Sequence, residues 1–136
     1  MSDAEFFTGL TGGQNDFAQA VAALRATGIS VEQFPHSLNA LFPGSRLRFQ
    51  LTLNDRYCQF PSRAVETELF GIRVPVTALE DLVQGKLWAA MDTTRRASKR
   101  QKDRLDLTRI CEPHPRIIPI IPIGLIPEVD QLRNPS

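Results

Sequence analysis

The chain has 136 residues, which is the length of one domain with a single modest hydrophobic core. Sixteen basic and fifteen acidic side chains leave a formal charge of +1, so no global field draws the protein toward nucleic acid or an anionic membrane. The two cysteines, Cys58 and Cys111, are far apart in sequence, which fits neither a disulfide framework nor a zinc knuckle. Any electrostatic function must therefore be local.

The sequence also argues against a membrane location. The first residues lack a basic segment followed by a long apolar one, so a secretory signal is not expected. The most apolar stretch, residues 117–127, is too short to span a bilayer as a helix and is interrupted by prolines. We therefore expect a cytoplasmic protein with reduced thiols and no membrane partner.

The first half of the chain predicts one helix and two strands. Residues 15–28 place apolar side chains at helical spacing and end at a glycine. Residues 29–34 and 46–53 alternate apolar and polar side chains, which is typical of strands. Between these strands, residues 37–45 contain a Pro-Gly pair and predict a loop or a single turn.

The middle of the chain contains prolines that limit regular structure. Residues 55–67 predict two helical pieces separated at Pro61, because a proline inside a helix costs about 3 kcal/mol. Residues 68–76 predict a strand or a tight hairpin that turns at Gly71, with Pro75 at an edge or a strand end.

Two further helices are predicted after this segment. Residues 79–91 carry an apolar stripe, and Thr77 with Glu80 has the spacing of a capping box at its start. The second helix covers residues 98–111 and ends before Pro113. Its expected inner positions are Leu105, Leu107, Ile110 and Cys111.

We expect an α+β fold in which a small mixed sheet of three to four strands is packed by helices within one domain, residues 1–112. The remaining residues, 113–136, are rich in proline and isoleucine and predict an extended or polyproline-like tail. The isoleucines need cover, so the tail is expected to lie along the domain or against a partner. Self-association through the tail is one alternative.

Charge is concentrated in one segment, residues 95–104, and two interpretations of it remain open. On a helix, Lys99, Lys102, Asp103 and Asp106 gather along one side. They form either weak ion pairs on a solvated face, or a site where lysines hold phosphate oxygens and a carboxylate positions a base or a metal. Spacing alone favours the solvated face. The same basic segment is also consistent with a small interaction module that contacts nucleic acid or an acidic protein.

No phosphate-binding loop of the GxxxxGK[ST] kind occurs, and neither histidine has a ligand at metal-binding spacing. The order of three stretches is more informative. The strand "RLRFQLTL" is followed by a G-x-x-V-x-V-x-x-x-E-D-L-x-x-x-K pattern from Gly71 to Lys86, and then by K-D-x-x-D at Lys102, Asp103 and Asp106. Over residues 46–112 this resembles the second half of nucleotidyltransferase-like proteins, the superfamily of AbiEii-type toxins and minimal nucleotidyltransferases.

The resemblance implies transfer of a nucleotidyl group from a nucleoside triphosphate, with magnesium ions held by acidic residues on adjacent strands. It implies catalytic roles for Lys86, Asp103 and Asp106. It also implies that Lys86, Lys99 and Lys102 bind the nucleotide or its phosphates. An RNA or a protein partner is consistent with this family.

Two departures from the family pattern change the expected activity. The family has a Gly-Ser turn and an acidic pair on a strand before the segment that matches residues 15–28, and we expect this chain to begin too late to contain them. A further acid is expected near Gln50, whose neutral amide does not replace a carboxylate as a ligand for a hard cation. We therefore predict no metal site and a truncated or degenerate member with impaired catalysis and residual nucleotide or partner binding.

Overall fold

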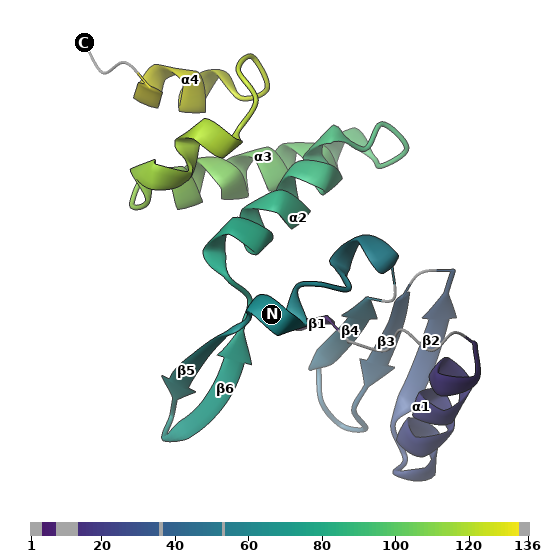
Figure 1. The fold of residues 1–136 in the computed structure, drawn as a ribbon. Coiled ribbons are helices and arrows are strands. Elements are labelled where there is room, and N and C mark those ends of the chain that lie inside the picture. The colour runs from purple at the N-terminus through teal and green to yellow at the C-terminus, as the bar shows by residue number, and fades with distance from the viewer. Residues whose placement is uncertain (1–3, 8–13, 36, 53, 134–136) are drawn as a thin grey trace. The chain divides into compact units, whose positions relative to one another are not determined.

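The chain folds as an α+β protein, as the sequence predicts, in a computed structural model that describes residues 4–7, 14–35, 37–52 and 54–133 (Figure 1). It divides into two units, residues 1–76 and residues 77–136, and each is described here by itself. Within the described residues, no helix combines the length and the apolar character needed to cross a bilayer.

The first unit contains a mixed sheet with the strand order β1-β4-β3-β2. Strand β1 pairs in parallel with β4, and the other two pairings are antiparallel. Helix α1 contacts β2. These elements are α1 (Gln14–Ala26), β1 (Ala4–Phe7), β2 (Ser30–Phe34), β3 (Ser37–Leu41) and β4 (Arg48–Thr52).

The loop predicted for residues 37–45 is wrong in its first half, because residues 37–41 form β3. This strand lies between β2 and β4, and its residues Leu38, Asn39 and Ala40 are all buried. Residues 37–40 do alternate polar and apolar side chains, but the run is short and the Pro-Gly pair soon after it favoured a loop. The Pro-Gly pair, Pro43 and Gly44, lies in the turn that follows.

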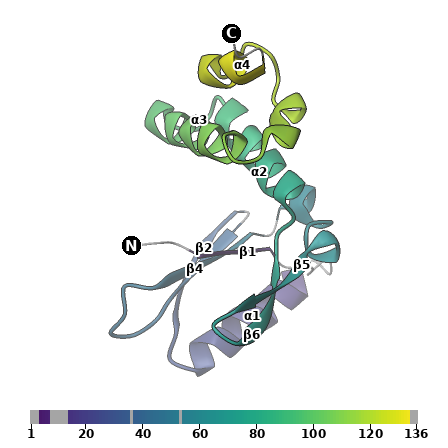
Figure 2. The same ribbon diagram turned by 90° about the vertical axis from the view of Figure 1, so that its left-hand side faces the viewer.

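A separate two-stranded sheet follows two short 3-10 helices, η1 (Asp55–Tyr57) and η2 (Pro61–Arg63). The two helical pieces predicted around Pro61 are confirmed as these short turns, although residues 65–67 belong to a strand. Strands β5 (Val65–Leu69) and β6 (Ile72–Val76) form the hairpin predicted to turn at Gly71 (Figure 2).

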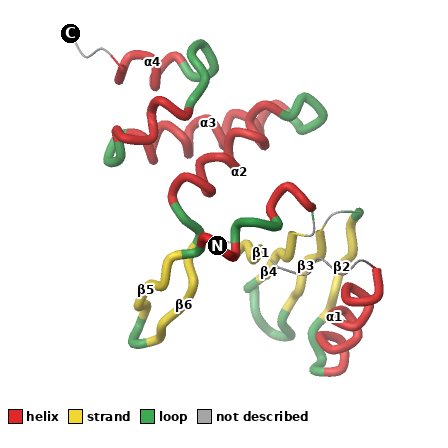
Figure 3. Tube along the Cα trace, in the orientation of Figure 1, coloured by secondary structure: helices red, strands yellow, loops and turns green. Residues whose placement is uncertain are grey.

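Up to Arg133, the last residue described, the regular structure of the second unit is helical (Figure 3). It contains α2 (Leu79–Met91), α3 (Ala97–Cys111), η3 (Pro115–Ile120) and α4 (Pro127–Arg133). Its buried core draws side chains from all four helices and from the segment between η3 and α4: Val83, Leu87, Ala90, Leu107, Cys111, Ile117, Ile118, Ile121, Ile126 and Val129.

The extended backbone predicted for residues 113–136 is therefore wrong for residues 115–120 and 127–133, which are helical. Pro115 and Pro127 stand at the first positions of η3 and α4, where a helix does not need the missing N–H group. Four isoleucines of this segment, Ile117, Ile118, Ile121 and Ile126, are buried inside the unit, whereas Ile123 is 83% exposed. The contacts divide the chain after Val76.

Two details of α2 and α3 differ from the sequence prediction. The residue that caps α2 is Ala78, with no side-chain hydrogen bond, so the predicted capping box of Thr77 and Glu80 is wrong. The predicted inner residue Leu105 is 49% exposed, whereas Asp103 is buried. Asp103 occupies an inner position of α3 because Lys86 on α2 and Arg95 in the turn after α2 neutralise its charge.

Glu80 instead pairs with Arg116, which ties the start of α2 to η3. This hydrogen bond holds the pKa of Glu80 below its ordinary value of 4.5. Since the folded-state pKa is lowered, the pair stabilises the unit above the unfolded-state pKa, and the contribution is lost as pH falls through the folded-state pKa. We predict that Glu80→Gln loses less stability than the unchanged chain as pH falls below about 5, measured by urea unfolding. Parallel profiles for the two chains would contradict this prediction.

The two cysteines differ in environment. Cys58 is exposed, whereas Cys111 is buried in the helical core, and burial raises the pKa of the Cys111 thiol. Because the thiolate is the reactive species, we predict that a thiol-specific disulfide reagent modifies Cys58 at least about 100-fold faster than Cys111 under native conditions. Both thiols should react rapidly in denaturant. Equal native rates would show that the helical unit opens readily.

Candidate functional site

The ammonium group of Lys86 lies between two carboxylates of the neighbouring helix. Its Nζ donates a hydrogen bond of 2.9 Å to Oδ2 of Asp106 and lies 3.6 Å from Oδ1 of Asp103. Lys86 belongs to α2, and both aspartates belong to α3. The three residues for which the resemblance implies catalytic roles are therefore in one cluster, although 20 positions separate Lys86 from Asp106.

A second cation completes this cluster. Nη1 of Arg95 donates a hydrogen bond of 2.9 Å to Oδ2 of Asp103, so that carboxylate is shared by Lys86 and Arg95. The side chain of Asp103 is only 9% exposed, whereas those of Lys86 and Asp106 are 29% and 22% exposed. Two cations thus balance two carboxylates, and the charged ends of Lys86 and Asp106 remain accessible to water.

Helix packing explains why these residues meet. Asp103 and Asp106 stand three positions apart, so they share one side of α3. Leu107, one turn beyond Asp103, is completely buried, as is Val83, one turn before Lys86. The apolar stripes that join α2 to α3 therefore bring Lys86 to the aspartates, and the ion cluster lies at the margin of the core.

Lys99 and Lys102, the other predicted phosphate-binding residues, do not join the cluster. Both are exposed on α3, and neither side chain makes a hydrogen bond or an ion pair with any residue that the structure describes. The structure thus brings together Lys86, Asp103 and Asp106 and leaves the two remaining lysines in solvent.

Arg95 is a site residue that sequence reasoning did not single out. It lies in the turn between α2 and α3, where its backbone N–H bonds to the carbonyl of Asp92. No helical spacing connects a turn residue with Asp103, eight positions later. The only signal in the sequence was its membership of the basic segment 95–104.

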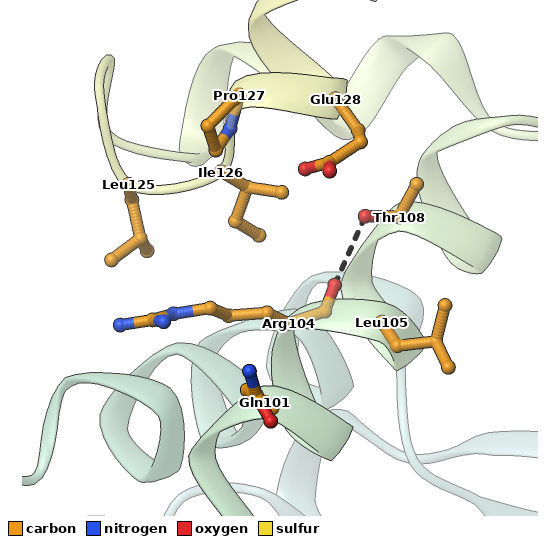
Figure 4. Close-up of a pocket in the computed structure, with 8 residues that line it drawn as sticks. All are labelled: Gln101, Arg104, Leu105, Thr108, Leu125, Ile126, Pro127 and Glu128. Atoms are coloured by element: carbon orange, nitrogen blue, oxygen red, sulfur yellow. Dashed lines mark hydrogen bonds between the residues drawn. The ribbon is translucent and has the colours of Figure 1, made fainter. Parts of the chain in front are cut away.

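A cavity of about 410 Å³ lies on a different side of α3, between that helix and the start of α4 (Figure 4). Its lining includes the Arg104 side chain, whose Nε is buried without a hydrogen-bond partner, and the hydroxyl of Thr108, which donates to the Arg104 carbonyl. Leu105 and Thr108 lie about 200° around the helix from Asp103 and Asp106 respectively. The cavity and the Lys86 cluster are therefore separate features of the helical unit. The lining consists of Gln101, Arg104, Leu105, Thr108, Leu125, Ile126, Pro127 and Glu128.

The sheet of the first unit contains a strand that the sequence analysis did not predict. Strand β1 precedes α1 and pairs in parallel with β4, and the register places Glu5 opposite Gln50. Gln50 is the neutral residue that stands where the resemblance calls for an acid. Among the side chains that the structure describes, no three His, Cys, Asp or Glu residues gather as metal ligands. The described residues therefore do not supply the oxygen ligands of a two-magnesium site.

Comparison with known proteins adds no further assignment. No protein-family model, no curated protein and no solved structure matches the chain.

Proposed function

We propose that the chain is a nucleotidyltransferase-like protein whose α2–α3 ion cluster binds the phosphates of a nucleoside triphosphate. The observation that supports this proposal best is the position of Lys86, held 2.9 Å from Asp106 and 3.6 Å from Asp103. The sequence resemblance names the same three residues, and no spacing rule would bring residues of two different helices together.

The geometry of Lys86 suits a phosphate contact. An ammonium group has three donors and acts as a point charge, so it can hold a carboxylate and a phosphate oxygen at once. Lys86 is 29% exposed, which leaves its charged end within reach of a ligand. Asp103 and Asp106 fix the direction of the lysine side chain before the ligand arrives, which lowers the entropic cost of binding.

The neighbouring carboxylates also set a requirement. A triphosphate carries several negative charges and would be repelled by Asp106 unless a cation travels with it. Magnesium bound to the triphosphate would neutralise part of that charge. Binding by the cluster is therefore expected to depend on magnesium even though the described residues provide no resident metal site.

The proposed activity is binding with impaired transfer. The described residues do not fit the two-magnesium centre of the family, because Gln50 is neutral and no three His, Cys, Asp or Glu side chains gather among them. The proposal also includes binding of an RNA or protein partner, because a domain that binds without catalysis can function by recruiting another molecule.

Calorimetric titration of the full chain with ATP, GTP, CTP and UTP, each with magnesium, tests the proposal. At least one nucleotide should bind, and Lys86→Ala should weaken that binding by about tenfold or more, equivalent to about 1.4 kcal/mol. Arg46→Ala, which removes an exposed cation outside the helical unit, is the matched control and should bind normally. Absence of binding by every nucleotide would refute the phosphate role.

A second candidate function is supported by the charge distribution on α3. Asp103 and Asp106 of α3 pair with Lys86 and Arg95, whereas Arg96, Lys99 and Lys102 are exposed. The aspartates therefore do not neutralise these three cations, and the exposed surface around them is more basic than the net charge suggests and fits the phosphate backbone of a nucleic acid.

This second candidate makes a distinct prediction. Binding of a single-stranded RNA oligonucleotide should weaken steeply with salt, because each phosphate contact releases a counterion. The double variant Lys99→Ala/Lys102→Ala should reduce the salt slope by about 1.4, whereas Lys86→Ala should leave it unchanged. Salt-independent binding, or no binding, would rule out this function without affecting the nucleotide proposal.

A further inference from the structure

The β5–β6 hairpin has one apolar face and one polar face. Its register pairs Val65 with Val76 and Leu69 with Ile72, and alternation puts these four side chains on the same side of the hairpin. They are exposed by 56%, 39%, 48% and 64% respectively. Glutamates and an arginine occupy the opposite side. The hairpin thus presents an uncovered apolar face, and single exposed apolar residues would not form such a pattern.

The hairpin also lacks internal support. It forms a two-stranded sheet of its own among the described strands, and an isolated hairpin is at best marginally stable in water. Its turn residues, Phe70 and Gly71, both have positive φ angles, 52° and 77°. The first of these positions favours asparagine or glycine, yet it holds a fully exposed phenylalanine. An additional strand beside the hairpin would supply the missing stabilisation.

The two edges of the hairpin are not equivalent. In a hairpin with a two-residue loop, the residues that flank the loop, Leu69 and Ile72, exchange hydrogen bonds, and such pairs alternate along the strands. Glu66 and Pro75 form one of the intervening pairs, whose backbone groups point outward. Pro75 has no N–H, so the outer edge of β6 is blocked there. Glu66 and Glu68 direct their N–H groups to the outer edge of β5, where no other described strand pairs.

Charge decides which occupant fits the open edge. A second copy of the chain that paired through β5 in antiparallel registers centred on Glu66, Thr67 or Glu68 would place a glutamate opposite a glutamate, which is destabilising. A strand with lysine or arginine at those positions would gain favourable pairs. Its alternate side chains would be apolar, so that they extend the face formed by Val65 and Leu69.

We propose that the outer edge of β5 binds an extended segment of a partner protein, in which apolar residues alternate with lysine or arginine, as a third strand. Backbone hydrogen bonds to Glu66 and Glu68 supply affinity, and the two carboxylates select the basic residues. Phe70, at the exposed end of the hairpin, adds an aromatic contact for the same segment. This binding mode is independent of the nucleotide proposal because it uses residues of the other unit.

The test uses the full isotope-labelled chain and a capped peptide of alternating lysine and valine, six residues long. Saturation with the peptide should slow amide hydrogen exchange at Glu66 and Glu68 by about tenfold or more. A peptide with glutamate in place of lysine should not bind. Glu66→Pro removes an outward N–H at the position opposite Pro75 and should abolish binding of the basic peptide. Glu66→Gln keeps the N–H but removes the charge, so it should weaken the binding and reduce its salt dependence without abolishing it.

Four outcomes would overturn the proposal. Slow exchange at Glu66 and Glu68 in the free chain at every concentration would mean that another part of the same chain already pairs with the outer edge of β5. Slow exchange that appears as the chain concentration rises would identify a second copy as the occupant. Equal binding of the acidic peptide would indicate non-specific adhesion. Binding that survives in a folded Glu66→Pro variant would exclude the edge as the site.

Discussion

Removal of residues 113–136 is expected to unfold the helical unit. Five of the ten residues in its buried cluster lie in that segment: Ile117, Ile118, Ile121, Ile126 and Val129. Burial of each such side chain contributes about 1.5–3 kcal/mol, so the loss of all five is comparable to the entire stability of a domain, about 5–15 kcal/mol. Circular dichroism at the helix band should show that the truncated chain loses the helical signal of α2 and α3.

A matched pair of substitutions separates core packing from simple loss of isoleucine. Ile117→Ala, at a completely buried position, should lower the free energy of unfolding by about 2–5 kcal/mol. Ile123→Ala, at a position that is 83% exposed, should change it by no more than about 0.5 kcal/mol. Urea unfolding followed by Trp88 fluorescence measures both. For the truncation, an unchanged helical signal in the chain that lacks residues 113–136 would contradict the assignment of residues 113–136 to the core.

Substitution of Lys86 by methionine is expected to affect stability as well as binding. It leaves Asp106 without its hydrogen-bonded cation and leaves Asp103, which is 9% exposed, with Arg95 alone. We predict a loss of about 1–2 kcal/mol in the free energy of unfolding, below the cost of breaking a fully buried pair because Lys86 is partly exposed. Lys99→Met, at an unpaired lysine of α3, should change stability by no more than about 0.5 kcal/mol.

A double-mutant cycle distinguishes structural from functional effects of Lys86. Lys86→Met combined with Asp106→Asn should recover part of the lost stability, with a coupling energy of about 0.5–2 kcal/mol. It should not recover nucleotide binding, because the cation that would contact phosphate is still absent. Additive stability changes would show that the contact between Lys86 and Asp106 contributes nothing to the fold.

Periodicity and turn chemistry predicted much of this fold. The turn at Gly71 and the helices at residues 79–91 and 98–111 follow from local patterns. The structure confirms the two helices within a residue and confirms the turn, although the first hairpin strand begins at Val65 and not at residue 68. The strand β3 was not predicted, because its run is short and a Pro-Gly pair follows soon after it. The helices after Pro113 were not predicted, because prolines at helix starts resemble helix breakers. The conformation of these elements depends on their tertiary contacts: β3 pairs with β2 and β4, and the residues after Pro113 pack into the core of the helical unit.

The candidate site was predictable only in part. Helical spacing places Asp103 and Asp106 on the same side of α3, and the compound motif associates them with Lys86. The contact itself depends on how α2 packs on α3, which no local pattern encodes. Arg95 was not predicted as a site residue because it lies in a turn. Leu105 was assigned to the interior in place of Asp103 because apolar side chains are buried more often than carboxylates.

Locating the bound nucleotide on the protein is the most direct test of a phosphate role for the Lys86 cluster. Backbone amide resonances of the labelled full chain should be followed during titration with ATP and magnesium. We expect the largest shifts around Lys86, Arg95, Asp103 and Asp106, and we expect them to disappear in Lys86→Ala. Shifts confined to residues that line the Arg104 cavity, or no shifts at saturating ATP, would contradict this role.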